Sequence, residues 1–313
     1  MIVDPKNSWL RMLFTFRGTS ISHTGMRIGF MTLCACVVTY LEIHFDIDDN
    51  YTLTSTPFTL IGLALGIFLG FRNNAAYERY WEGRTLLGRL VNSSRTWARQ
   101  VPMYLTPSQP DEQTEVDGLK RELVVYVMAY VHTLKNGLRD DDPFPELESF
   151  LPSEEVEPLR KERNVPAAML HQLGVRLTAA WKRGWLTDYH YQTLDATLTS
   201  LTDIQGGCER VKNTPIPYAY SVLIHRTVAF YCFFLPFGIV KDVQWLTPLV
   251  VLLISHAFFG LDEIGDEIEE PFGKDDQDLP VAALAKTIEI NLRQQLGEEE
   301  VEELPKPVDN VLL

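Results

Sequence analysis

The chain has 313 residues, a formal net charge of −14 and 46% hydrophobic residues. A chain of this length suits one large domain or two ordinary ones. The acidic balance argues against a nucleic-acid partner, because no stripe of lysine and arginine is present to neutralise phosphates.

Four apolar runs predict membrane-spanning helices. They cover residues 26–45, 57–71, 223–240 and 245–261. Each approaches the roughly 17–25 residues that cross a bilayer as a helix. Apolar runs of this length are also found as core helices of soluble proteins, but two close pairs with short connectors favour the membrane. We therefore predict an all-α, multi-pass membrane protein with four transmembrane helices per subunit. The N-terminus lacks the charge and hydropathy order of a signal peptide, so the first run is expected to be retained.

Charged residues predict how the spans are oriented. Basic residues collect before the first run and after the second, whereas the connector between these runs carries only acids. The bases before the first run are Lys6, Arg11 and Arg17, and those after the second run are Arg72, Arg79, Arg84 and Arg89. The acids of the connector are Asp46, Asp48 and Asp49. Because positive charge marks the cytoplasmic side, both termini and the polar middle of the chain are expected in the cytoplasm.

The polar middle, residues 72–222, is too polar to enter lipid and shows mostly helical periodicity. Further helices are predicted over 112–138, 166–185 and 187–211, with a loop over the proline- and acid-rich residues 139–155. No HExxH or GxSxG motif and no phosphate-binding glycine loop is present, so we do not expect an enzyme. Residues 281–313 are expected to form an acidic C-terminal tail.

The second apolar run carries two stripes at helical spacing. Gly62, Gly66 and Gly70 recur every fourth residue, and a bulky face is formed by Leu60, Leu63, Ile67, Phe71 and Asn74. A glycine stripe allows another backbone to approach closely. The bulky face then either meets lipid or lies on a symmetry axis as an apolar constriction, which gates by dewetting. The polar residues that follow, 72–84, favour the second interpretation because they suit a water-filled vestibule.

Motifs spread along residues 8–280 resemble the bestrophin family of ion channels, in particular its prokaryotic branch. The motifs are Phe16-Arg17-Gly18-Thr19, Leu65-Gly66-Ile67, Ile216-Pro217 and Pro271-Phe272-Gly273 with the acids that follow. The resemblance implies a single channel domain over residues 1–280 and a homopentamer around a central pore. It also implies a large helical cytosolic portion and a cell-membrane location, the inner membrane in a Gram-negative bacterium.

The resemblance assigns roles to particular residues. Leu63, Ile67 and Phe71 would line the neck of the pore, with Leu60 and Asn74 in the vestibule. The acidic run 261–278 would correspond to the calcium clasp of animal members, through Glu267, Glu270, Asp275 and Asp278. Two of these positions hold an amide in the animal proteins and a glutamate here. Calcium binding is therefore one interpretation of the run, and a solvated acidic helix end is the other.

The expected function is a channel for small monovalent ions. Carboxylates in the outer connector and the acidic interior favour cations. An anion channel of the same family is the close alternative, and a non-conducting membrane scaffold is a third interpretation. The expected partners are membrane lipid, monovalent ions and other copies of the chain, with no nucleic acid.

Overall fold

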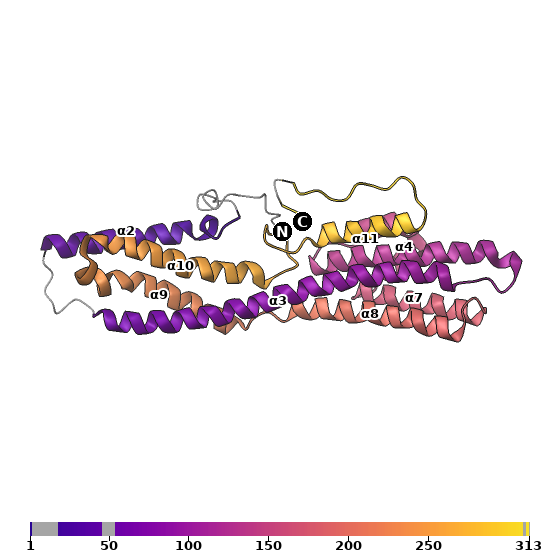
Figure 1. Cartoon of the computed structure of the whole chain (residues 1–313), viewed down its shortest axis with the longest axis horizontal. Coiled ribbons are helices and arrows are strands. Elements are labelled where there is room, and N and C mark those ends of the chain that lie inside the picture. Colours follow the sequence, from indigo (N-terminus) through magenta and orange to yellow (C-terminus); the bar gives the residue numbers. More distant parts are fainter. Residues whose placement is uncertain (2–17, 46–53, 309–310, 313) are drawn as a thin grey trace. The chain divides into compact units, whose positions relative to one another are not determined.

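The computed structural model describes residues 1, 18–45, 54–308 and 311–312 (Figure 1). Across these residues the regular elements are α- and 3₁₀-helices, as the sequence predicts. They are α2 (Ile21–Phe45), α3 (Ser55–Tyr104), η2 (Pro110–Glu112), α4 (Gln113–Leu138), α5 (Phe144–Phe150), α6 (Ser153–Leu159), α7 (Val165–Lys182), α8 (Asp188–Asn213), α9 (Tyr218–Val243), η3 (Gln244–Leu246), α10 (Thr247–Glu269) and α11 (Val281–Gln295). The acidic connector Asp46, Asp48 and Asp49 lies outside the described residues.

The chain divides into two compact units. Unit 2 comprises residues 4–80 and 215–270, and unit 1 comprises residues 1–3, 81–214 and 271–313. In unit 2, α2 packs against both α9 and α10, which also pack against each other. The start of α3 joins them, and its buried Leu65 and Leu69 complete an apolar core with Ala35 and Val228.

Within the described residues, three helical stretches are long and apolar enough to cross a membrane. They are Ile21–Phe45, Ser55–Tyr104 and the 52-residue stretch Tyr218–Glu269. The third stretch contains both α9 and α10, which are separated by η3 and by a positive φ of 49° at Gln244. Because α9 and α10 pack side by side after this break, the stretch folds back on itself (Figure 1). Apolar surface is abundant on these helices, and the exposed residues include Phe30, Phe230 and Leu253.

Unit 1 is a helical bundle centred on α4. Most side chains from Leu123 to Leu138 are buried, and α4 contacts α5, α7, α8 and α11. The α3 helix also enters this unit, where the fully buried indole of Trp97 donates a hydrogen bond to the Leu123 carbonyl oxygen over 3.0 Å. Residues 112–211, which alternate polar and apolar side chains at helical spacing, thus form the helices that the sequence predicts, and α4 lies at the centre of the bundle.

Two segments of unit 1 differ from the sequence predictions. Residues 139–155, expected as a loop, contain α5 and the start of α6, because Leu147 and Val156 bury apolar side chains. Residues 281–313, expected as an acidic tail, begin with α11, which packs against α4 and buries Ile288 and Leu292. The acidic composition of the last residues concealed the apolar face of the helix before them.

Candidate functional site

The bulky face of α3 is exposed in the single chain. Leu63, Ile67 and Phe71 are 66%, 50% and 66% exposed, and Leu60 is 64% exposed. The face ends at the exposed Asn74, whose amide donates a hydrogen bond to Glu78 over 3.3 Å. The structure therefore places all the predicted neck and vestibule residues on one continuous strip of surface.

This strip points away from the rest of unit 2. Leu65 and Leu69, each two residues from Ile67, lie about 160° around the helix from it. They are 3% and 0% exposed and belong to the core. The packing of α3 therefore uses one face and leaves the opposite apolar face available for a pore, for lipid or for another copy of the chain.

Among the described residues, another helix of the chain approaches the glycine stripe closely at Gly62 and not at Gly66 or Gly70. A Cβ atom at Gly62 would lie 2.6 Å from the hydroxyl oxygen of Tyr231 on α9, whereas Gly66 and Gly70 have no described atom within 4 Å of such a Cβ. The Tyr231 ring is fixed by an edge-on contact with Phe258, with ring centroids 5.3 Å apart. Gly62 therefore allows the close approach of α9 to α3, as the stripe predicts.

We expect Gly62→Ala to lower the free energy of unfolding by about 1–3 kcal/mol, because the new methyl group overlaps a buried hydroxyl. Thermal unfolding in detergent measures the loss. Tyr231→Phe removes the overlapping atom and should restore most of the stability in the double variant. Gly66→Ala is the matched control, and a loss of stability there would instead report the approach of another copy of the chain.

A buried arginine follows the neck face directly. The side chain of Arg72 is 0% exposed, and its Nη1 atom donates to the Asp262 carboxylate over 2.9 Å and to the Asp262 carbonyl oxygen over 3.1 Å. Its Nη2 atom donates to the Asp266 carboxylate and lies 3.9 Å from a carboxylate oxygen of Glu269. A guanidinium group of this kind binds two carboxylates because its donors are arranged in a rigid fork.

His225 on α9 completes this cluster. Its Nδ1 atom lies 2.6 Å from the second carboxylate oxygen of Asp262, and its Nε2 atom lies 3.5 Å from Asp266. The sequence predicts Arg72 only as one of the bases that orient the spans, and it gives no contact between Arg72 and His225. The signal that could have found the cluster is the spacing of Asp262, Asp266 and Glu269, which puts three acids on one face of α10.

The chain matches known proteins along its length. The family model described as bacterial/fungal bestrophin protein covers residues 1–294. The chain belongs to the bestrophin family. The voltage-dependent anion channel-forming protein RSc3414 of Ralstonia nicotianae is 38% identical over 95% of both chains. The voltage-dependent anion channel-forming protein YneE of Escherichia coli K12 is 35% identical over 96% of both chains. The solved structure of a bacterial bestrophin homologue from Klebsiella pneumoniae is similar with a TM-score of 0.80 and 34% identity, covering 88% of this chain and 99% of that one.

Within this bestrophin, the motif Pro271-Phe272-Gly273 forms a closed turn of unit 1. The Leu279 amide donates to the Pro271 carbonyl oxygen over 2.9 Å. The Phe272 ring is buried, and it lies 3.2 Å from the position that a Cβ atom would take if Gly83 had a side chain. The Asp278 carboxylate, also buried, accepts a hydrogen bond from the Asp275 amide over 2.7 Å. Asp275 and Asp278 are therefore part of an ordered turn.

The calcium prediction for this bestrophin concerns residues of both units. Glu267 and Glu270 belong to unit 2, and Asp275 and Asp278 belong to unit 1. Burial raises the pKa of the Asp278 carboxyl to about 6, against the lowering effect of the Asp275 hydrogen bond. Across the described residues, no group of three or more His, Cys, Asp or Glu side chains is close enough to hold a metal ion. Since calcium also takes backbone oxygens, its binding here stays a prediction.

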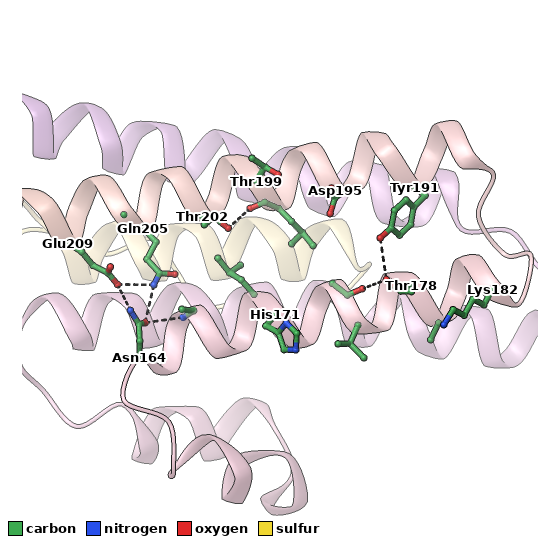
Figure 2. A pocket seen from close by; sticks show the side chains of 17 residues that line it. Asn164, His171, Thr178, Lys182, Tyr191, Asp195, Thr199, Thr202, Gln205 and Glu209 are labelled. Atoms are coloured by element: carbon green, nitrogen blue, oxygen red, sulfur yellow. Dashed lines mark hydrogen bonds between the residues drawn. The ribbon is translucent and has the colours of Figure 1, made fainter.

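A groove of about 800 Å³ lies elsewhere in the bestrophin chain, between α7 and α8 of unit 1 (Figure 2). At one end Asn164 and Gln205 are hydrogen-bonded to Glu209 over 2.9 and 2.8 Å. Further along, the hydroxyl groups of Thr178 and Tyr191 are 3.2 Å apart. Within each pair these polar groups bind one another across or along the groove.

Proposed function

We propose that this bestrophin is an ion channel in which several copies of the chain surround a central pore. In this proposal Leu63, Ile67 and Phe71 form an apolar neck, and Leu60 and Asn74 lie in the adjoining vestibule. Small monovalent ions pass when the neck widens and wets, as in other hydrophobic constrictions.

One observation carries the proposal. The exposed apolar face of α3 lies opposite the face that packs in unit 2, and it continues into polar residues without a break in the helix. An ordinary membrane anchor needs apolar surface towards lipid, but it does not need that surface to continue into amides and charges. A helix that lines a pore needs both, because the pore joins an apolar neck to water.

The proposed assembly is a pentamer in the cell membrane, and in the inner membrane of a Gram-negative bacterium. The four spans are α2, the first half of α3, α9 and α10, whose apolar surfaces face lipid or other copies. Both termini and the polar helices of unit 1 lie in the cytoplasm in this arrangement. The positive charges that follow the second run support that orientation.

Anions are the proposed permeant ions. The relatives are named as anion channel-forming proteins, and these names do not support the cation preference expected from the acidic sequence. An apolar neck carries no fixed charge to exclude anions, and aromatic rings such as that of Phe71 have a positive edge. Cation conduction is the second candidate, and the net charge of −14 is the observation that favours it.

Reversal potentials in bilayers test the choice of ion. With purified protein and a potassium chloride gradient, we expect currents to reverse near the chloride equilibrium potential. Reversal near the potassium equilibrium potential would contradict anion selection and favour the second candidate. A protein that inserts and gives no current under either gradient direction would support the scaffold interpretation instead.

A further inference from the structure

We infer that the buried cluster of Arg72, Asp262 and Asp266 is a latch that sets the width of the neck from behind. The inference rests on the proposed function, because it concerns the same pore helix. It adds that the diameter at Phe71 is determined by an ion-paired side chain that never reaches the pore. Arg72 is thus proposed as a positioning residue for conduction.

Arg72 is buried on α3, directly after the last residue of the proposed neck. It follows Phe71 by one residue and therefore points about 100° away from it around the helix. Phe71 is 66% exposed and Arg72 is 1% exposed, so the two neighbours face opposite environments. A rigid helix transmits any sideways shift at Arg72 to Phe71. In a ring of identical subunits, such a shift would change the neck diameter by twice its size.

The contacts that α3 makes with the rest of unit 2 change in kind along the helix. Up to Leu69 the packed face of the helix is apolar. Beyond it, directional polar contacts take over. The Asn73 amide donates to the Leu261 carbonyl oxygen over 2.8 Å, and the Arg79 Nε atom donates to the Glu269 carbonyl oxygen over 3.1 Å. Together with the Arg72 pairs they connect α3 to α10 at the end of the neck.

These polar contacts restrict the position of α3 more than apolar packing does. Apolar packing is non-directional and tolerates small shifts of a helix. A buried guanidinium group does not, because any displacement leaves an uncompensated charge on one side. The close approach is built in at Gly265, where a Cβ atom would lie 2.5 Å from the Asn73 side-chain oxygen and 3.2 Å from Arg72 Nη1. The latch therefore confines α3 to a narrow range of positions.

Asp262 is also held by a second helix, α9. His225 on α9 binds the carboxylate oxygen of Asp262 that Arg72 does not use. The Glu269 carboxylate, which lies near Arg72, also accepts a hydrogen bond from the Ile216 amide over 2.8 Å. The anchor for α3 is thus tied to α10 and to the start of α9, and a shift of α3 alone breaks it.

Single-channel recording of Arg72→Gln in the full chain tests the latch. We expect the conductance to rise severalfold, and larger polyethylene glycols to enter the neck, because the ion-paired contact between α3 and α10 beside the neck is lost. Arg72→Lys keeps a charge that reaches Asp262 and should give an intermediate conductance. Arg27→Gln is the control, since it removes an exposed 3.3 Å ion pair between α2 and Glu263 of α10 without touching α3.

A second variant keeps the test decisive if Arg72→Gln does not assemble. The Asp266 side chain is 40% exposed, so Asp266→Asn is expected to fold, and it should raise the conductance by a smaller factor. Wild-type conductance and polymer cut-off in the variants that assemble would overturn the latch, provided that Ile67→Ala still alters the current. If Ile67→Ala is also silent, the neck assignment itself fails, which separates the two outcomes.

Discussion

Replacing Ile67 by alanine is expected to raise the single-channel conductance severalfold. Ile67 is half exposed at the centre of the proposed neck, with Leu63 and Phe71 one turn away on either side. Shortening its side chain in every subunit widens the constriction and lets water occupy it. Each ~1.4 kcal/mol removed from the barrier to ion passage raises the rate about tenfold, so even a modest gain in hydration gives a measurable current.

The measurement is single-channel current in planar bilayers, with Phe68→Ala as the matched control. Phe68 is 52% exposed on the same helix, but it lies about 100° around the axis from Ile67. The proposal therefore places it outside the pore, and its removal should leave conductance unchanged. Equal effects of the two substitutions would contradict the neck assignment, since they would show that any lost bulk on α3 acts alike.

The exposed face of α3 could be predicted from the sequence because it depends on helical periodicity alone. Leu63, Ile67 and Phe71 recur every fourth residue, and a helix of any length brings them to one side. Each also avoids the packed face for the same reason, since Leu65 and Leu69 fall opposite them. Periodicity likewise predicts α4, α7 and α8, whose bounds lie close to the expected ranges.

The partners of charged residues could not be predicted in the same way. The pairing of Arg72 with Asp262 joins residues 190 positions apart in the chain. Any of several acids in the run 261–278 could have met it, and the choice depends on how α10 lies against α3. The same applies to α11. Its apolar residues are separated by charges, and only the packing against α4 shows which of those charges are buried.

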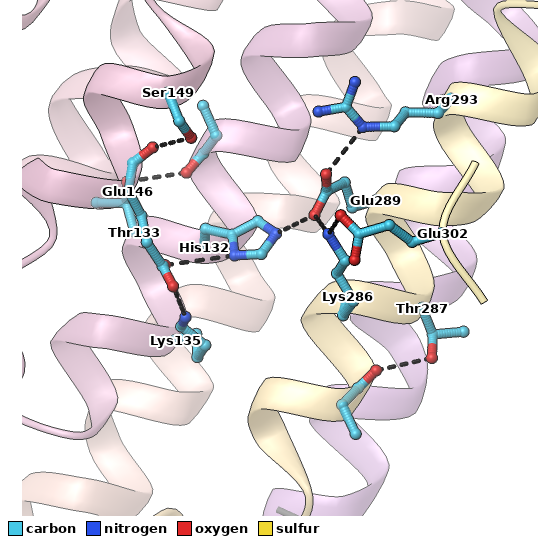
Figure 3. Close-up of polar contacts among 12 residues, drawn as sticks. His132, Thr133, Lys135, Glu146, Ser149, Lys286, Thr287, Glu289, Arg293 and Glu302 are labelled. Atoms are coloured by element: carbon cyan, nitrogen blue, oxygen red, sulfur yellow. Dashed lines mark hydrogen bonds and ion pairs between the residues drawn. The ribbon is translucent and has the colours of Figure 1, made fainter. Parts of the chain in front are cut away.

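Glu289 is a buried charged residue of α11, and basic side chains surround its carboxylate (Figure 3). Its carboxylate is 7% exposed and lies 3.1 Å from His132 Nε2 on α4 and 2.8 Å from Arg293 Nε. Burial raises the pKa of Glu289, but hydrogen bonds from His132, Lys286 and Arg293 outweigh it and hold the pKa at about 2. Relative to the usual 4.5, this difference corresponds to about 3 kcal/mol of stability at neutral pH.

We therefore expect Glu289→Gln to lower the free energy of unfolding by about 3 kcal/mol at neutral pH, because three basic groups lose their shared anion. A depressed pKa stabilises the folded state above about 4.5, and this contribution is lost as the pH falls towards about 2. The difference between wild type and variant should accordingly shrink over that range. Thermal unfolding in detergent at several pH values, with hydrogen exchange of residues 281–295, measures both effects.

The matched control for this prediction is Glu302→Gln. Glu302 also pairs with Lys286, over 2.9 Å, but its side chain is 74% exposed. Exposed pairs of this kind contribute about 0–1 kcal/mol, so the control should unfold nearly as the wild type does at every pH. If both variants lose the same stability, or if the loss in Glu289→Gln does not change on acidification, the docking of α11 does not depend on a buried anion. A loss confined to Glu289→Gln that disappears in acid would show that the buried Glu289 anion contributes to the docking of α11 against α4.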